Sequence, residues 1–160
     1  VYIITDKSSP LNKYTGSPID GYFAATGKEK GKQVTSLETI EEQMDLLFNK
    51  SSNEEQATQL KMFLRNKQEM IKQGNDLVES WFKHDLNSMQ AISQKGLDLF
   101  GGGDELLRKR NDKWMQVLPG LMAKQSQFIA VGALHLSGTF GIINQLQQSA
   151  YTILSVYLQH

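Results

Sequence analysis

Cysteine is absent from the 160-residue sequence, which excludes disulfide bonds, thiolate metal sites and cysteine nucleophiles. This absence does not name a compartment, because a cysteine-free chain suits both the cytosol and the periplasm. An excess of charge is lacking too: seventeen Lys and Arg residues balance seventeen Asp and Glu residues. A neutral chain is not built to bind nucleic acid or an anionic membrane through bulk charge, although local basic clusters stand near Lys30 and Lys109. No apolar run approaches the roughly 20 residues of a membrane span.

Several catalytic and cofactor-binding patterns are also missing. The sequence has no Gly-x-Ser-x-Gly, no His-Glu-x-x-His, no Walker phosphate loop and no dinucleotide-binding glycine fingerprint. The three glycines at 101–103 lack the Lys-Ser/Thr of a phosphate loop and predict a flexible joint instead. We therefore expect no organic cofactor. The chain opens on Val1 rather than Met and shows no signal-peptide pattern, so we expect a processed or trimmed product.

The composition that is present suits a packed domain, because 39% of the residues are hydrophobic and 21% are charged. We expect the whole chain, 1–160, to form one domain. Residues 37–124 should be mainly helical, and three helix starts are marked by capping patterns: Thr39 with Glu42, Ser52 with Glu55, and Asp85. The spacing of apolar residues predicts helices over 19–30, 53–83 with an interruption at Gly74, 85–95, and 104–118 with a kink or an end at Pro119.

Four segments have the composition of β-strands: 1–5, 33–37, 127–133 and 151–158. The apolar run from Phe128 to Val131 is typical of a strand buried on both faces of a parallel sheet. Residues 137–150 read as a loop followed by a helix, so 127–158 is predicted to form a βαβ unit with a right-handed crossover. The sequence therefore predicts an α/β fold: a small, mostly parallel sheet with flanking helices and a long helical insertion.

Two polar residues follow predicted strands, where open α/β sheets bind their ligands. His135 lies in the loop after the strand at Phe128, and a neutral imidazole there could bind a metal or act as a general base. A histidine that merely hydrogen-bonds its loop is the commoner case. Glu38 follows the strand 33–37 and could accept a proton, bind a metal or pair with an arginine. More commonly, such a glutamate stabilises the helix that follows it, because its negative charge interacts favourably with the helix dipole.

Arg110 and Asn111 lie together in the helix before Pro119. The fork-shaped guanidinium of Arg110 suits a carboxylate or a phosphate, but a solvated helix face explains it equally well. We expect Trp81 and Trp114 to lie in the core rather than to form a ligand platform. His84, near a helix end, is expected to be a surface or capping residue, and His160, the last residue, is expected to be mobile or part of a trimmed boundary.

Four stretches in this order resemble one family: Asp20–Ala25; Gly31–Val34 followed by Leu37-Glu38-Thr39 and Glu42-Gln43; Arg110-Asn111 with Trp114; and Gly132-Ala133-Leu134-His135 with Gly138. The chain resembles the carboxy-terminal half of the TraB/GumN family, which is similar to the Tiki metalloproteases. The resemblance spans roughly residues 19–158. No single stretch is specific, but the ordered set is.

The resemblance implies an EreA/ChaN-like α/β fold, incomplete at its amino-terminal side, and a metal-dependent, peptidase-like hydrolase. It implies that Glu38, Arg110, Asn111 and His135 line one cleft as catalytic residues. His135 and Glu38 would bind a divalent manganese, cobalt or zinc ion, and Arg110 would orient a carbonyl or a carboxylate of a peptide or small-molecule substrate. Relatives are often exported, which implies the periplasm or cell envelope, with the cytoplasm as the alternative.

This chain departs from the family pattern in holding one Gly-x-x-His motif, where the family has a first one upstream. A second, smaller departure is Ser149-Ala150-Tyr151, where the family has a glycine before the aromatic residue. If the upstream part has been removed, we expect no activity from this chain, and open sheet edges should favour self-association. The alternative is a non-catalytic binding protein of the same fold, which would act on a peptide, a signalling partner or a component of polysaccharide assembly.

Overall fold

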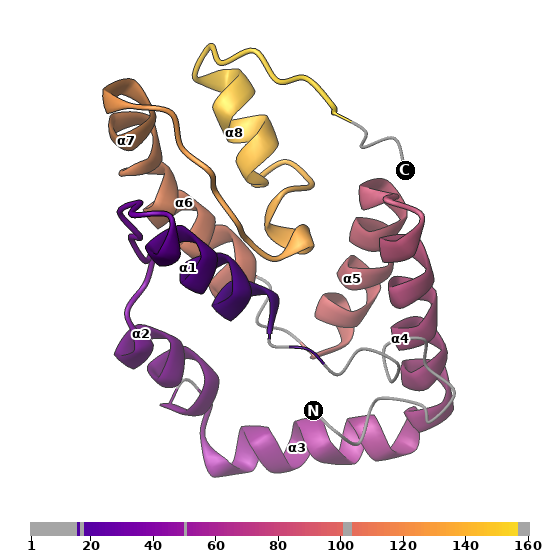
Figure 1. Ribbon diagram of the computed structural model, residues 1–160. Helices are drawn as coiled ribbons and strands as arrows, with labels where there is room; N and C mark the ends of the chain where they lie inside the picture. The colour runs from indigo at the N-terminus through magenta and orange to yellow at the C-terminus, as the bar shows by residue number, and fades with distance from the viewer. Residues whose placement is uncertain (1–15, 17, 50, 101–103, 157–160) are drawn as a thin grey trace.

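The computed structural model of the protein describes residue 16 and residues 18–49, 51–100 and 104–156, and in these ranges every regular element is helical (Figure 1). Short non-α turns add a π-helical segment at Asp45–Asn49, another at Asp104–Arg108 and a 3₁₀ turn at Ala133–His135. The α-helices are α1 (Ile19–Glu29), α2 (Ile40–Met44), α3 (Asn53–Arg65), α4 (Lys67–Phe82), α5 (Leu86–Phe100), α6 (Lys109–Met115), α7 (Leu118–Lys124) and α8 (Ile142–Gln148).

The predicted mostly parallel sheet is wrong, because the described residues contain no strand. Segments 33–37 and 127–132 are irregular chain, and so is 151–156, the described part of the last predicted strand. No backbone hydrogen bond joins one of these segments to another, and a strand exists only through such bonds with a neighbour. The α/β class and the βαβ unit over 127–158 are therefore corrected to a helical arrangement. The predicted strand 1–5 lies outside the described residues.

The packing of the core explains why apolar residues alternate in segment 127–132 as they do in a strand. Its buried centre joins α6, α7 and α8 through Trp114, Leu118, Ile142 and Leu146. Ile129 and Val131 pack against this centre, whereas Phe128 is 74% exposed and touches the Phe23 ring of α1 with centroids 4.9 Å apart. Alternate residues of segment 127–132 thus face the core. The segment packs against helices and does not pair with a strand.

Helices α2, α3 and α4 form an arm that runs along the lower side of the molecule in Figure 1 and then turns up beside α5. The two capping boxes that begin α2 and α3 are both present, as the sequence predicts. The predicted interruption at Gly74 is wrong, because the break falls at Asn66, between α3 and α4. Trp81 was expected in the core, but it is 45% exposed at the end of α4.

The junctions between α4 and α5 and between α6 and α7 follow local rules. His84 takes a left-handed φ of 57° after α4. Asp85 then caps α5, because its carboxylate accepts hydrogen bonds from the backbone N–H and the hydroxyl of Ser88. Pro119 does not end a helix. It lies in the first turn of α7, where its missing N–H leaves no bond unmade, and the kink predicted there falls at 116–117, between α6 and α7.

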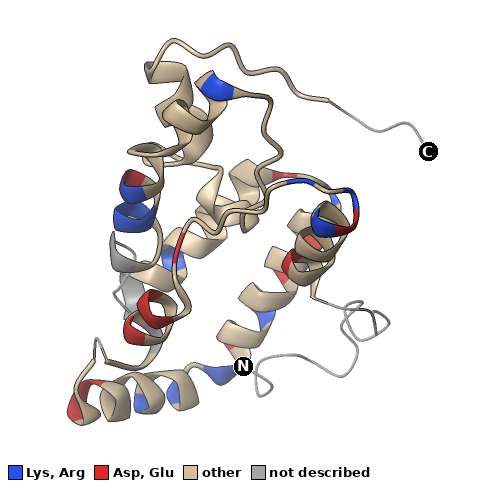
Figure 2. Cartoon of the chain, turned by 60° about the vertical axis from the view of Figure 1, so that its left-hand side comes forward, with Lys and Arg blue, Asp and Glu red and all other residues tan. Residues whose placement is uncertain are grey.

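Charge is divided unevenly along the chain. Every Lys, Arg, Asp and Glu precedes Gln125, so α8 is uncharged, and the ribbon in Figure 2 has basic (blue) and acidic (red) positions mixed over the helices. The segment that carries His135 therefore has no formal charge of its own and receives its electrostatic environment from α6 and from Glu38. None of the described helices combines the length and the apolar character that crossing a bilayer requires.

Candidate functional site

His135 ends the short 3₁₀ turn that follows the irregular segment 127–132. Its backbone N–H donates to the carbonyl of Gly132 at 2.9 Å, which closes the turn and directs the side chain inward. The imidazole is 7% exposed and lies against the indole of Trp114, with ring centroids 4.5 Å apart. The loop thus delivers a titratable ring to the edge of the hydrophobic core.

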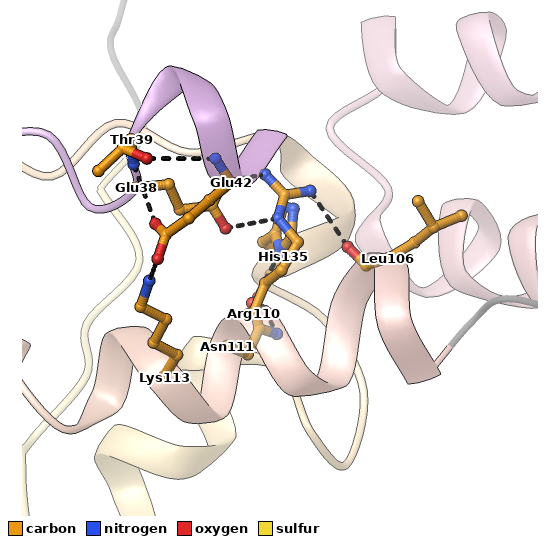
Figure 3. Close-up of polar contacts among 8 residues, drawn as sticks. All are labelled: Glu38, Thr39, Glu42, Leu106, Arg110, Asn111, Lys113 and His135. Carbon is orange, nitrogen blue, oxygen red and sulfur yellow. Dashed lines mark hydrogen bonds and ion pairs between the residues drawn. The ribbon is translucent and has the colours of Figure 1, made fainter. Parts of the chain in front are cut away.

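Asn111 of α6 holds this loop at two points. Its side-chain Nδ2 donates to the backbone carbonyl of His135 at 3.1 Å and to that of Phe140 at 2.7 Å. Its Oδ1 lies 2.7 Å from Nδ1 of His135 (Figure 3). Because carbonyl oxygens only accept, the amide nitrogen must face them, and Oδ1 must accept from the ring.

This geometry fixes the tautomer of His135. Nδ1 carries the proton that it donates to Asn111, so the neutral ring keeps its lone pair on Nε2. Burial and, to a lesser extent, the charge of Arg110 lower the pKa of His135 to about 4, although the Glu38 carboxylate opposes both effects. The ring is therefore neutral at pH 7, with Nε2 able to accept a proton or to bind a metal.

Glu38 and Arg110 form a two-pronged ion pair beside the ring. Arg110 donates from Nε to Oε1 of Glu38 at 2.7 Å and from Nη2 to Oε2 at 2.9 Å. Nη1 donates to the carbonyl of Leu106 at 3.1 Å, and the guanidinium lies over the Trp114 ring. Burial alone would raise the pKa of Glu38, but the hydrogen bonds and the charge of Arg110 outweigh it, so the pKa is lowered.

The start of α2 places Glu38 where α6 can reach it. Thr39 accepts from the backbone N–H of Glu42, and the Glu42 carboxylate accepts from the backbone N–H of Thr39 at 3.0 Å. The same carboxylate pairs with Lys113 of α6 (Figure 3). This capping box is thereby tied to α6 one turn from Arg110, so the helix start and the ion pair support one another.

Two glycines let the loop after His135 close tightly. A Cβ on Gly138 would lie 2.0 Å from the side-chain nitrogen of Gln90, and its φ of +84° is left-handed. A Cβ on Gly141 would lie 2.3 Å from the carbonyl oxygen of Ser137, a fixed backbone atom. A side chain is therefore strained at Gly138 by its left-handed φ and excluded at Gly141 by the backbone, which keeps the Phe140 carbonyl within reach of Asn111.

The described residues meet only part of what a divalent metal requires. His135 offers Nε2 in the right protonation state, but both Glu38 oxygens already accept from Arg110. Nowhere in the described ranges do three His, Asp or Glu residues gather closely enough to hold a metal ion. His135 thus fits as a single ligand, and Glu38 could join it only through its remaining lone pairs or after Arg110 moves.

The structure brings together all four residues selected from the sequence, Glu38, Arg110, Asn111 and His135 (Figure 3). Trp114, expected in the core, is buried and contacts both His135 and Arg110, whereas His84 is exposed. The carbonyl of Phe140 is a partner that the sequence did not indicate. Its only signal was the spacing of Gly138 and Gly141, which marks a tight loop.

A comparison with protein families decides the broader relationship. The model of the TraB/PrgY/gumN family matches residues 4–154, nearly the whole chain. The chain belongs to the TraB/PrgY/gumN family. Neither the curated proteins nor the solved structures contain a match to it. The ordered motifs from Asp20 to Gly138, which resemble this family, therefore identified it correctly.

Proposed function

We propose that the chain supplies the His135 side of a metal-dependent, peptidase-like hydrolase site. The observation that carries this proposal is the fixed tautomer of His135, which keeps a basic Nε2 on a neutral ring beside a carboxylate and a guanidinium. His135 would hold a divalent manganese, cobalt or zinc ion through Nε2. Such an ion supplies a polarised water or carbonyl when bound.

The other residues have roles that follow from their bonds. Among the described residues, Arg110 donates from three of its five N–H groups, two to Glu38 and one to the Leu106 carbonyl, and the other two would orient a substrate carbonyl or carboxylate. Glu38 fixes the plane of that guanidinium. Asn111 positions His135 and does not itself reach the reacting atoms, because its oxygen and nitrogen are committed to the ring and the loop.

One observation favours the alternative, a binding protein that has the same arrangement without the chemistry. Glu38 and Arg110 satisfy each other, so both charges are used in holding α2 against α6. In that case the cluster is a structural joint, and it would bind a peptide or another partner without a metal.

The two functions differ in whether Nε2 of His135 binds a metal. Thermal melts with manganese, cobalt or zinc test this, because an ion at 100 times its dissociation constant stabilises the fold by about 2.7 kcal/mol. The decisive variant is His135→Asn, whose amide nitrogen can still donate to Asn111 in place of Nδ1 but which has no counterpart of Nε2. His84→Asn is the matched control, because it removes an exposed histidine at a left-handed position that asparagine tolerates.

The hydrolase proposal requires a metal-dependent rise in Tm that disappears in His135→Asn and persists in His84→Asn. A rise that persists in His135→Asn would exclude His135 as the ligand. Equal melts with and without every ion would favour the binding protein. The readout is stability rather than turnover, so it requires metal binding by the chain but no catalysis.

A further inference from the structure

Two neighbouring groups of the site differ in their freedom to bind a cation. Nε2 of His135 accepts no hydrogen bond from the described residues, yet it is not one of the fully buried atoms that lack a partner, so it meets solvent. The carboxylate of Glu38 is occupied, because Arg110 donates to both of its oxygens (Figure 3). The ring is therefore ready for a cation, whereas the carboxylate that would join it is not.

The charge of Arg110 opposes a cation on His135 in a second way. The guanidinium acts on the ring, since its charge contributes to the lowered pKa of His135. A positive charge that disfavours a proton on the imidazole also disfavours a metal cation at Nε2, because like charges repel strongly in a partly buried site. Arg110 therefore both occupies the carboxylate and repels the cation.

The ion pair of Arg110 and Glu38 is too buried to separate without compensation. The side chain of Glu38 is 6% exposed and that of Arg110 is 25% exposed. Separating such a pair leaves a poorly solvated charge without its partner, which is strongly destabilising. A cation alone would compensate Glu38 but not Arg110, and an anion alone would compensate Arg110 but not Glu38. Both charges find new partners only when a cation and an anion arrive together.

Arg110 is also the group that an anion can reach and recognise. It is the more exposed member of the pair, and three of its five N–H groups have acceptors among the described residues. The two parallel bonds to Glu38 show that this guanidinium is placed to hold a planar carboxylate. A ligand carboxylate therefore has the shape and charge needed to replace the one that Arg110 already holds.

We propose that a divalent cation and a carboxylate-bearing ligand enter this site together, and that the ion pair of Arg110 and Glu38 closes it when both are absent. The ligand carboxylate takes the guanidinium, and the released Glu38 joins His135 in binding the cation. This inference rests on the proposed function, which makes Nε2 of His135 a metal ligand. Because coupling between binding sites is reciprocal, each ligand strengthens the other by the same factor. The substrates are thereby narrowed to molecules with a free carboxylate.

Calorimetric titration of the chain with cobalt(II), in acetate and in acetamide at equal ionic strength, tests the proposal. Acetamide has the shape of acetate without its charge, so it cannot replace Glu38 on Arg110. We expect acetate to tighten cobalt binding by at least about tenfold, a typical size for coupling between two sites. In Arg110→Gln, cobalt should bind at least about tenfold more tightly than in the wild type without acetate, and acetate should change its affinity less than about twofold.

Lys109→Gln is the matched control, because it removes one positive charge from an exposed position of the same helix, and it should keep the acetate effect. The wild-type comparison of acetate with acetamide needs no variant, so it decides the matter even if Arg110→Gln does not fold. Equal cobalt affinity in the two solutions, or an acetate effect that survives in Arg110→Gln, would overturn this inference and leave His135 as a metal ligand. Cobalt binding that is absent, or that persists in His135→Asn, would overturn the proposed function and this inference with it.

Discussion

The arm of α2 to α4 and the body of α6 to α8 are held together in different ways. Within α3 and α4 the bonds are local, as in the capping box of Ser52 and Glu55 and the ion pair of Lys72 and Asp76, whereas α2 is tied to α6 through Glu42 and Lys113. In the body the bonds span the sequence: Arg110 reaches back 72 residues to Glu38, and Asn111 reaches forward 24 residues to His135.

Burial follows the same division. Ser80 is the one buried residue in the described part of α2, α3 and α4, whereas the body buries Trp114, Leu118, Ile142 and Leu146. Local bonds stabilise one helix at a time, and a shared core stabilises elements together. Arg110, Asn111 and His135 belong to the region with the shared core, so their geometry should persist when α3 and α4 unfold locally.

The largest expected difference in stability between the two regions comes from replacing one leucine in each. Leu118→Ala empties a core position that is 2% exposed and should lower the free energy of unfolding by about 4 kcal/mol. Leu64→Ala removes a side chain that is already exposed on α3 and should cost less than about 0.5 kcal/mol. Urea unfolding followed by circular dichroism measures both, and equal losses would contradict the division into two regions.

Asparagine offers the same comparison for hydrogen bonds. Asn111→Ala removes three bonds and leaves two loop carbonyls and the His135 ring without their partner, so it should cost about 3 kcal/mol. Asn66→Ala loses one exposed bond to the carbonyl of Met62 and should cost less than about 1 kcal/mol. The tautomer of His135 is read from ring ¹⁵N shifts. In the wild type they should show a protonated Nδ1, and the same tautomer in Asn111→Ala would refute the assigned role.

The body should also be the region that acid weakens first. The folded-state pKa of His135, about 4, lies below its unfolded value of about 6.5, so the unfolded chain binds the proton more readily. Stability should therefore be full above pH 6.5 and fall by roughly 3 kcal/mol as the pH drops to 4. Glu38, whose pKa is also lowered, adds a loss at still lower pH.

The matched variant for this pH dependence is His135→Asn, which cannot titrate. Its stability should be flat between pH 6.5 and 4.5, and the later loss from Glu38 should remain. A wild-type protein whose urea midpoint does not change over that interval would show that the ring is not buried as described.

The smallest expected effect lies in the arm. Ser52→Ala removes the cap of α3 and should cost about 1 kcal/mol, confined to that helix. Amide hydrogen exchange should quicken in α3 and stay unchanged in α6 and α8. Faster exchange in α8 would mean that the arm and the body unfold as one unit.

The same division explains what the sequence could predict of the fold. Both capping boxes and the Asp85 cap were identified because each depends on residues three apart. The sheet was predicted wrongly because a strand depends on a partner elsewhere in the chain. Ile129 and Val131 alternate with exposed neighbours as strand residues do, but helices provide their packing surface.

The sequence predicted which residues form the site but not which hydrogen bonds join them. The family resemblance selected Glu38, Arg110, Asn111 and His135, and the structure places them in contact. Spacing alone could not show that Arg110 would occupy both Glu38 oxygens, nor that Asn111 would determine the tautomer. Those facts depend on how α6 meets two loops that are distant in sequence.

The glycines at 138 and 141 also bear on how this protein can change over evolution. A side chain is excluded at Gly141 and strained at Gly138, so the course of the loop after His135 resists substitution at both positions. The residues between and beside them, Ser137, Thr139 and Phe140, all line a cavity against α5. The shape and polarity of this cavity can therefore change at these three positions while the imidazole of His135 stays in place.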